Sequence, residues 1–185
     1  MDQEGVDAPD EALLAAYRAG ILKSAAALYD RHSGDLYSYA FWRLRDTNES
    51  EDVVQEAFFR LFTHRSAKSP SSVRAFLYTV ARNLVLDVLR KASVRQKHLS
   101  FVFHTTSEGL APGDSPPAEL QGAALAELDR LPDDQRDAVV LKIFGKLTFP
   151  QIAEVQNVPE GTASSRYRNA IEKLAERLNV ERGNR

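Results

Sequence analysis

The feature that most limits how this chain can fold is the segment "SEGLAPGDSPPAE", residues 107–119. It holds three prolines, two glycines and three acidic residues among few bulky apolar ones. Proline lacks a backbone N–H and blocks helix continuation, while glycine loses much conformational entropy on ordering. Such a composition is typical of a linker and does not fill a core. We therefore expect the 185 residues to form two modules.

Apolar residues recur at intervals of three and four on both sides of this segment, and no alternating stretch is long enough for a sheet. We predict an all-α fold: two small helical domains joined by a flexible linker, the C-terminal one a helix-turn-helix. The predicted parts are an acidic N-terminal segment with a first helix (1–21), a helical domain (22–95), an acidic Pro/Gly linker (96–120) and a helix-turn-helix domain (121–185).

The first module is expected to contain a long helix over about residues 22–45, followed by the break "DTNES". Asn48, with Glu51 three residues later, resembles a capping box that starts the next helix. After residues 64–72 comes another helix with a wide apolar face. That face is predicted to consist of Val73, Phe76, Leu77, Val80, Ala81, Leu84, Val88 and Leu89.

In the second module, Pro132 and the acidic pair after it favour a helix start, and Gly145 is expected to stop that helix. Thr148 is the predicted cap of a short helix, and Asn157 suits a left-handed turn. A closing helix follows, so the pattern predicts a helix-turn-helix. Its expected inner stripe is Ala163, Tyr167, Ala170, Leu174 and Leu178.

The formal net charge of −2 hides a strong segregation of charge. Residues 70–98 carry six basic side chains against one acidic one, a net of +5. Residues 107–137 carry eight acidic side chains against two basic ones, a net of −6. This asymmetry indicates an anion-binding surface beside an acidic segment.

Several classes of function lack the residues they require. The chain has no cysteine, and its four histidines are scattered, so we expect no disulfide and no metal site. The nine glycines form no phosphate-binding loop, and neither a nucleophile motif nor HExxH is present. We predict that the protein is not an enzyme, with no catalytic residue, no cofactor and no small-molecule substrate.

The first twenty residues show no basic leader with an apolar run behind it, and no run of eighteen apolar residues occurs. A cytoplasmic protein without membrane insertion is expected.

Three stretches, in this order, resemble the extracytoplasmic-function (group IV) sigma factors of bacterial RNA polymerase. They are "SEDVVQEAFFRLF", "SVRAFLYTVARNLVLDVLRK" and "LPDDQRDAVVLKIFGKLTFPQIAEVQNVPEGTASSRYRNAIEKL". The resemblance covers roughly residues 22–92 and 128–178 and implies a region 2 domain followed by a region 4 domain. It implies that Asp52, Gln55 and Glu56 dock on the clamp helices of the largest polymerase subunit. An isolated pattern of this kind is more often an ordinary solvated helix face.

For the minus-ten element the resemblance implies contacts from the third helix of the first module. The residues concerned are Arg74, Tyr78, Arg82, Asn83, Arg90 and Lys91. Arginine and lysine neutralise phosphates, and Tyr78 is expected to offer its ring to an unstacked base. Residues 64–72 align with the family loop that holds a flipped base. Phe76 replaces the usual tryptophan, and we expect it in the core.

For the minus-35 element the resemblance points to the start of the closing helix. The residues are Thr162, Ser164, Ser165, Arg166, Arg168 and Asn169. Ser164 stands where the family commonly has lysine, and Asn169 where it often has arginine, which predicts a weaker phosphate contribution. Asn169 either reads a base edge or makes no contact.

The implied partners are core RNA polymerase, promoter DNA and an anti-sigma factor. The acidic linker is expected to thread toward the active centre of the polymerase, although any Pro/Asp/Ser-rich tether has the same appearance. Two other functions remain open: a stand-alone helix-turn-helix transcriptional regulator, and a helical adaptor without a DNA role.

Overall fold

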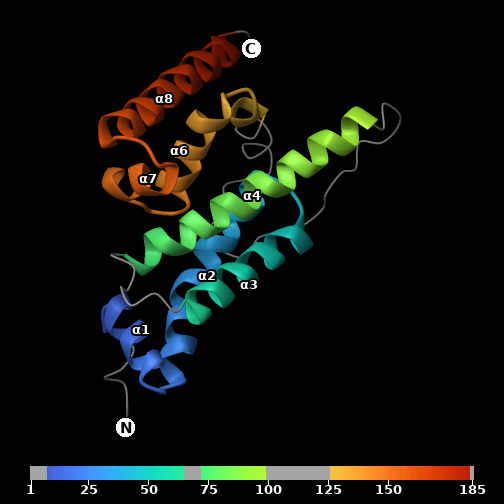
Figure 1. Cartoon of the computed structure of the whole chain (residues 1–185). Helices are drawn as coiled ribbons and strands as arrows, with labels where there is room; N and C mark the ends of the chain where they lie inside the picture. The colour runs from blue at the N-terminus through green and yellow to red at the C-terminus, as the bar shows by residue number, and fades with distance from the viewer. Residues whose placement is uncertain (1–7, 65–71, 99–125, 184–185) are drawn as a thin grey trace. The chain divides into compact units, whose positions relative to one another are not determined.

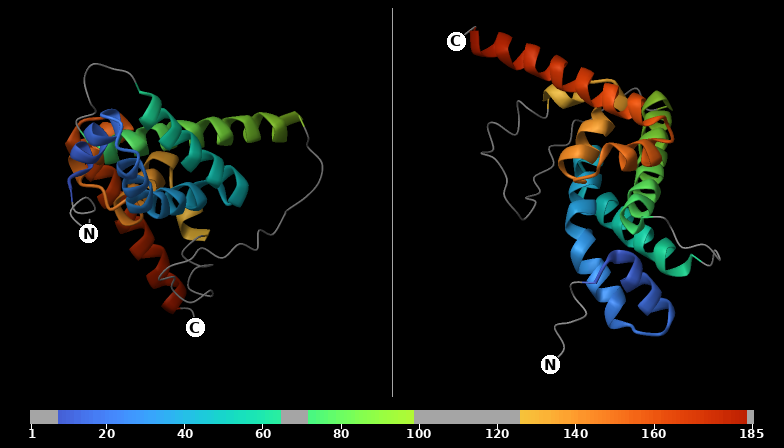
Figure 2. Two further views of the ribbon diagram at one scale, coloured as in Figure 1. Left: turned by 90° about the horizontal axis from the view of Figure 1, so that it is seen from below. Right: turned by 90° about the vertical axis from the view of Figure 1, so that its left-hand side faces the viewer.

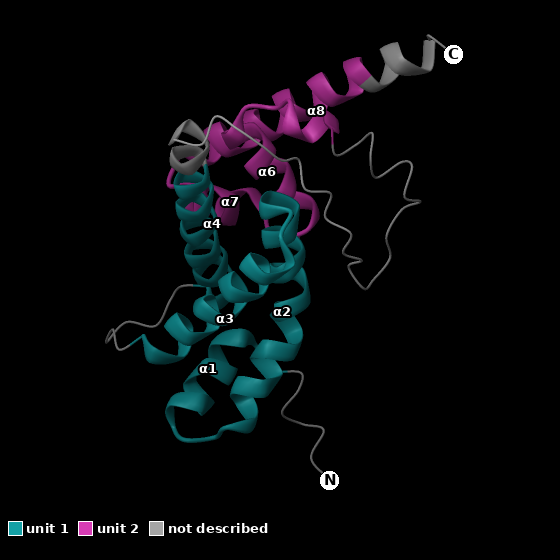
Figure 3. Cartoon of the chain, turned by 90° about the vertical axis from the view of Figure 1, so that its right-hand side faces the viewer, with its two compact units in different colours: residues 1–107 teal, residues 108–185 magenta. Residues whose placement is uncertain are grey.

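The structure is a computed structural model that describes residues 8–64, 72–98 and 126–183 (Figure 1). The elements in this part of the chain are helices, as predicted, and no strand occurs among the described residues. The chain divides into two compact units, residues 1–107 and 108–185 (Figure 3). The linker predicted over 96–120 falls mainly on residues 99–125, which lie outside the described residues.

Unit 1 contains four described helices: α1 (Asp10–Arg18), α2 (Lys23–Leu44), α3 (Thr47–Thr63) and α4 (Val73–His98). Helices α2, α3 and α4 pack against one another, and α1 packs on α2 and α4 (Figure 2). Their common core is formed by fully buried side chains, among them Leu28, Leu36, Tyr39, Leu61 and Leu77. Burial of an aliphatic or aromatic side chain of this size contributes about 1.5–3 kcal/mol.

The turn between α2 and α3 differs from the sequence prediction. Arg45 is left-handed, with φ of 57°, and leaves Asp46 extended. The Asp46 carboxylate then accepts a hydrogen bond from the Glu49 backbone N–H at 2.9 Å. The predicted cap at Asn48 is therefore wrong, because the helix begins at Thr47 and Asn48 lies inside its first turn.

The buried face of α4 is rotated from the predicted one. Val73, Leu77, Val80 and Ala81 are buried as expected. Ala75, Tyr78 and Val85 are also buried. Phe76, Leu84, Val88 and Leu89 are only half-buried. The apolar residues of α4 surround too much of the helix for periodicity alone to define the inner side, so the packing of α2 and α3 decides it.

Unit 2 contains α6 (Asp133–Ile143), α7 (Phe149–Gln156) and α8 (Glu160–Gly183). Each of these helices packs on the other two, around a core that includes Leu141, Ile152, Ala163 and Ala170. Tyr167 is half-buried and its ring lies 5.6 Å from that of Phe149. Leu174 is also half-buried, and the side chain of Leu178 lies outside the described residues.

The start of α7 and the turn that joins α7 to α8 both follow from local sequence signals. The Thr148 side chain accepts from the Gln151 backbone, and the Gln151 side chain accepts from the Thr148 backbone, which completes a capping box. Asn157 is left-handed, with φ of 53°, as predicted. Helix α6 ends at Ile143 with Phe144 as its C-cap, so it stops directly before Gly145, as predicted. The left-handed residue in this turn is Lys146, with φ of 51°.

Candidate functional surfaces

Helix α3 presents a small mixed surface that we call the α3 surface: Asp52, Gln55, Glu56 and Phe59. These four side chains line one shallow, open depression. Asp52 and Gln55 are exposed, and Glu56 is half-buried and paired with Arg60 at 2.7 Å. The opposite side of α3 is buried through Val53, Val54, Ala57, Phe58 and Leu61, so the core fixes the outward direction of the α3 surface.

Phe59 belongs to the α3 surface and was missed from the sequence. Its side chain is 61% exposed although it is aromatic. It follows Gln55 by four residues and Asp52 by seven, spacings that put side chains on one helix face. That spacing was a usable signal, because it places Phe59 on the helix face of the predicted polymerase-binding residues.

The outer side of α4 carries most of the residues predicted for the minus-ten element. Asn83, Arg90 and Lys91 are exposed and Arg82 is half-buried. Asn83 and Arg90 are seven residues apart and share a face. Arg90 is bonded to Asp87 at 2.8 Å in a largely solvated pair, which contributes little to stability and opens easily.

Arg74 is at the start of α4, away from Asn83 and Arg90. Its guanidinium bonds the Asp35 carboxylate of α2 at 2.8 Å, and both side chains are about one quarter exposed. Arg74 therefore joins two helices in addition to any role toward DNA.

Tyr78 does not offer its ring to a base, which corrects the prediction. The residue is 1% exposed and its ring packs edge-on against Tyr39, with centroids 5.5 Å apart. Burial raises the pKa of the Tyr78 hydroxyl far above its usual value of 10.0, and the nearby Arg74 charge opposes that rise only in part. Val85, seven residues after Tyr78, lies on the same side of α4 and is also buried. Both residues therefore belong to the buried face of the helix.

The loop predicted to hold a flipped base, residues 64–72, lies outside the described residues at positions 65–71. Its two flanks are described. The His64 ring lies 5.1 Å from the Phe76 ring, so the end of α3 contacts the first turns of α4.

The first turns of α8 place the predicted minus-35 residues in two different environments. Thr162, Arg168 and Asn169 are exposed, whereas Ser164 and Ser165 are half-buried. Ala163 and Ala170 are fully buried and orient the helix. The exposed residues are thus held on the outside by a well-packed inner stripe.

Arg166 is engaged within the helix-turn-helix. Its Nε atom lies 2.9 Å from Asp134 Oδ2, and its Nη1 donates to Gln156 Oε1 at 3.0 Å. Gln156 is itself buried and donates to the Asp134 carbonyl at 3.1 Å and to Asp137 Oδ2 at 3.3 Å. Arg166 therefore ties α8 to α6 and α7, and less of its charge is available to a phosphate.

The part of the chain that the structure describes contains neither a cluster of metal-ligating side chains nor a helix that could span a membrane. No three His, Cys, Asp or Glu side chains there are grouped to hold a metal ion. None of the described helices combines the length and the apolar character needed to cross a membrane.

Comparison with protein families places these surfaces in context. Residues 28–95 match Sigma-70 region 2, and residues 121–174 match Sigma-70, region 4. The two units therefore define the class: a promoter-recognising sigma factor, which binds core RNA polymerase and promoter DNA. Among similar proteins, the ECF RNA polymerase sigma factor SigL of Mycobacterium tuberculosis is 32% identical over 158 residues, covering 80% of this chain and 85% of SigL. The chain belongs to the extracytoplasmic-function (ECF) group of the sigma-70 family.

Further relatives agree with this assignment. The ECF RNA polymerase sigma factor SigW of Bacillus subtilis is 27% identical over 164 residues, covering 83% of this chain and 88% of SigW. The structure resembles the sigma factor RpoE of Bartonella quintana, solved with the anti-sigma factor NepR, with a TM-score of 0.65 and 24% identity over 89% of this chain and 98% of RpoE. That likeness concerns the fold. Sigma factors are generally non-enzymatic initiation factors.

Proposed function

We propose that this sigma factor docks on the clamp helices of the largest polymerase subunit through the α3 surface, contacts the minus-ten element through α4 and reads the minus-35 element with the start of α8. The observation that carries the proposal is the α3 surface: two acids and an amide around an exposed phenylalanine, held outward by a fully packed inner face. The domain divisions 22–95 and 121–185 are proposed as the corresponding functional parts.

The chemistry of the α3 surface favours a basic partner with some apolar character. Asp52 and Gln55 are exposed, so both can accept hydrogen bonds, and the Asp52 carboxylate attracts cations without a buried-charge penalty. Phe59 is exposed in the same depression, and burial of an aromatic ring is a common source of binding energy at protein interfaces. The Glu56–Arg60 pair is largely solvent-exposed, so it opens at little cost and leaves Glu56 able to turn toward a new partner.

On α4, the exposed residues Asn83, Arg90 and Lys91 support contacts with the opened minus-ten strand. The amide of Asn83 is suited to a base edge, and the two cations to phosphates. Arg82 is proposed as an additional phosphate contact, and Arg74 as a residue that mainly orients α4. Residues 64–72 are proposed to hold the flipped base.

On α8, Arg168, Asn169 and Thr162 are proposed as the principal minus-35 contacts because they are exposed. Ser164 and Ser165 supply shorter hydroxyl contacts near the helix start, where backbone N–H groups favour a phosphate. Arg166 is proposed to act mainly by holding α8 against α6 and α7.

An anti-sigma factor is the proposed regulator. RpoE of Bartonella quintana was solved with the anti-sigma factor NepR. A second fold neighbour, CnrH, was solved with the cytosolic domain of CnrY. CnrH has a TM-score of 0.65 and 20% identity, and the match covers 92% of this chain and 97% of CnrH. We infer that the chain acts in the cytoplasm, where core polymerase works, and that it catalyses no reaction and takes no cofactor. The linker is proposed to run toward the active centre of the polymerase.

The test is direct binding of the full chain to purified core polymerase in the absence of DNA. The variants Asp52→Lys and Phe59→Ala should each weaken binding at least tenfold, the scale of an interface hot spot. The control Glu176→Lys makes an equal charge change at an exposed position in unit 2 and should bind normally. Normal binding by both α3 variants would overturn the proposed docking surface.

A further inference from the structure

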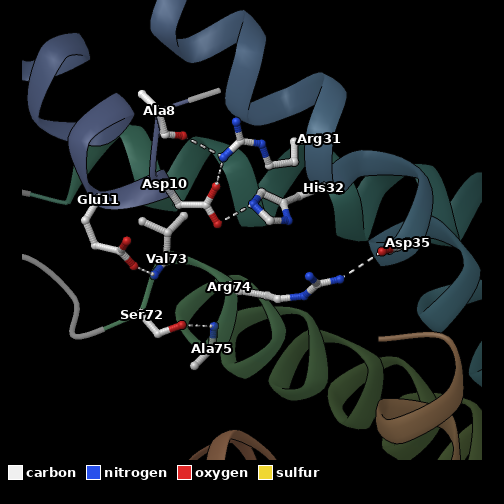
Figure 4. Close-up of polar contacts among 10 residues, drawn as sticks. All are labelled: Ala8, Asp10, Glu11, Arg31, His32, Asp35, Ser72, Val73, Arg74 and Ala75. Atoms are coloured by element: carbon white, nitrogen blue, oxygen red, sulfur yellow. Dashed lines mark hydrogen bonds and ion pairs between the residues drawn. The ribbon is translucent and has the colours of Figure 1, made fainter. Parts of the chain in front are cut away.

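Helix α1 contacts both flanks of the segment that joins α3 to α4. At the α3 flank, Arg18 Nη2 donates to the His64 carbonyl oxygen at 3.2 Å. At the α4 flank, Glu11 Oε1 accepts from the Val73 backbone N–H at 3.3 Å (Figure 4). Glu11 and Arg18 are seven residues apart and therefore lie on one face of α1. One face of α1 thus contacts His64, directly before residues 65–71, and Val73, shortly after them.

The Glu11 contact adds a hydrogen-bond partner at the start of α4. The first N–H groups of a helix have no partner within it. Ser72 Oγ accepts from the Ala75 N–H at 3.1 Å, and Glu11 accepts from the Val73 N–H (Figure 4). A carboxylate is also favoured there by the positive end of the helix dipole. Glu11, on a different helix, therefore supplies the acceptor for the Val73 N–H of α4.

Helix α1 is itself firmly attached, so it can act as a support. Asp10 bonds Arg31 Nη1 at 2.6 Å and His32 Nε2 at 2.7 Å, both on α2 (Figure 4). Leu13 and Leu14 on α1 are buried. The Tyr17 ring lies 4.7 Å from the Phe62 ring near the end of α3. These contacts fix α1 to α2 and α3 independently of Glu11 and Arg18.

We propose that α1 is a brace that sets the spacing and direction of the two flanks of residues 65–71, with Glu11 and Arg18 as positioning residues for minus-ten recognition. This inference rests on the proposed function, which assigns the flipped base to residues 64–72. The brace has a specific consequence: loss of Glu11 or Arg18 weakens capture of that base and leaves docking on the polymerase intact, because the α3 surface is on the outer side of α3 and its orientation depends on the core.

The experiment uses holoenzyme assembled from the full chain and core polymerase. The probe is a fluorescent single-stranded non-template oligonucleotide from a promoter that the wild-type holoenzyme transcribes. An abasic scan with the wild type first finds the position whose base contributes most to binding. Glu11→Ala and Arg18→Ala should each weaken binding of the intact oligonucleotide by about fivefold, the scale of a lost helix cap. Glu11→Gln keeps an acceptor oxygen and should retain most of the affinity.

A double-mutant cycle separates positioning from general stability. On the oligonucleotide that is abasic at the identified position, the alanine variants should bind as well as the wild type, because the base that the brace serves is gone. An equal loss on intact and abasic oligonucleotides, or a matching loss of affinity for core polymerase, would overturn the brace. So would unchanged binding of the intact oligonucleotide. If Glu11→Ala does not fold, Arg18→Ala, which changes a more exposed contact, provides the same cycle. Failure of the wild type to transcribe any promoter would instead overturn the proposed function.

Discussion

At the scale of single residues, side chains of similar chemistry have different roles because their surroundings differ. Arg166 and Arg168 are two positions apart on α8, yet Arg166 is bonded to Asp134 and Gln156 while Arg168 is exposed. Phe58 and Phe59 are adjacent, and only Phe58 is buried. Residue type alone therefore does not show which of two nearby residues is exposed and able to contact polymerase or DNA.

His32 gives a prediction about pH. It is buried, its Nε2 is bonded to Asp10 at 2.7 Å, and its Nδ1 has no hydrogen-bond partner among the described residues. Burial lowers the pKa of His32 below its ordinary value of 6.5, and the Asp10 carboxylate offsets this only in part. Below pH 6.5 the unfolded chain therefore binds more protons than the folded one, so the free energy of unfolding falls as the pH falls.

The measurement is urea unfolding of the wild type and His32→Gln between pH 8 and pH 5. Near pH 8 the histidine is almost wholly neutral in both states, so its contribution to stability changes little there. The wild type should lose more stability on acidification than His32→Gln does. Parallel pH profiles for the two proteins would show that His32 does not titrate with unfolding.

At the scale of elements, the helix-turn-helix is built from caps, a left-handed turn and one polar network. Thr148 and Gln151 start α7, Asn157 ends it, and buried Gln156 links α7 to Asp134 at the start of α6. Arg166 extends this network to α8. The orientation of α8, the proposed reading helix, thus depends on polar contacts as well as on Ala163 and Ala170.

The two arginines of α8 should therefore respond differently to removal. Arg166→Ala should lower the stability of unit 2 by about 1–2 kcal/mol, because it removes charge-assisted hydrogen bonds from a partly buried site. Arg168→Ala should leave stability unchanged, weaken minus-35 binding, and reduce the salt-dependence slope by about one. Thermal unfolding and fluorescence titration against minus-35 duplex at several salt concentrations measure both effects. A reversed pattern would exchange the two assignments.

At the scale of the whole molecule, the two units have separate cores, and a segment rich in proline, glycine and acid lies between them. A promoter contacted by both units is bound more tightly than by either one, because attachment of the first raises the effective concentration of the second. That gain depends on the length and stiffness of the connecting segment.

Insertion of ten Gly/Ser residues after Gly113 should therefore weaken holoenzyme binding to promoters that carry both elements, by roughly two- to tenfold. Binding to core polymerase, which is proposed to use the α3 surface, should not change. Filter binding with promoters that have both elements, or only one, gives the comparison. An equal effect on single-element promoters would show that the insertion disturbs a unit and not the coupling between units.

What the sequence determined was local. The start and end of α7 depend on contacts within a few residues, made by Thr148, Pro150 and Asn157. The helix-turn-helix could therefore be predicted from the sequence. The division into two helical parts followed from proline and glycine between two periodic stretches. The tertiary structure decided which side of each helix is buried, because that depends on neighbours distant in the chain. It placed Tyr78 inside against Tyr39 and left Phe59 outside. It also brought Glu11 to Val73, 62 residues away, a contact that no local pattern encodes.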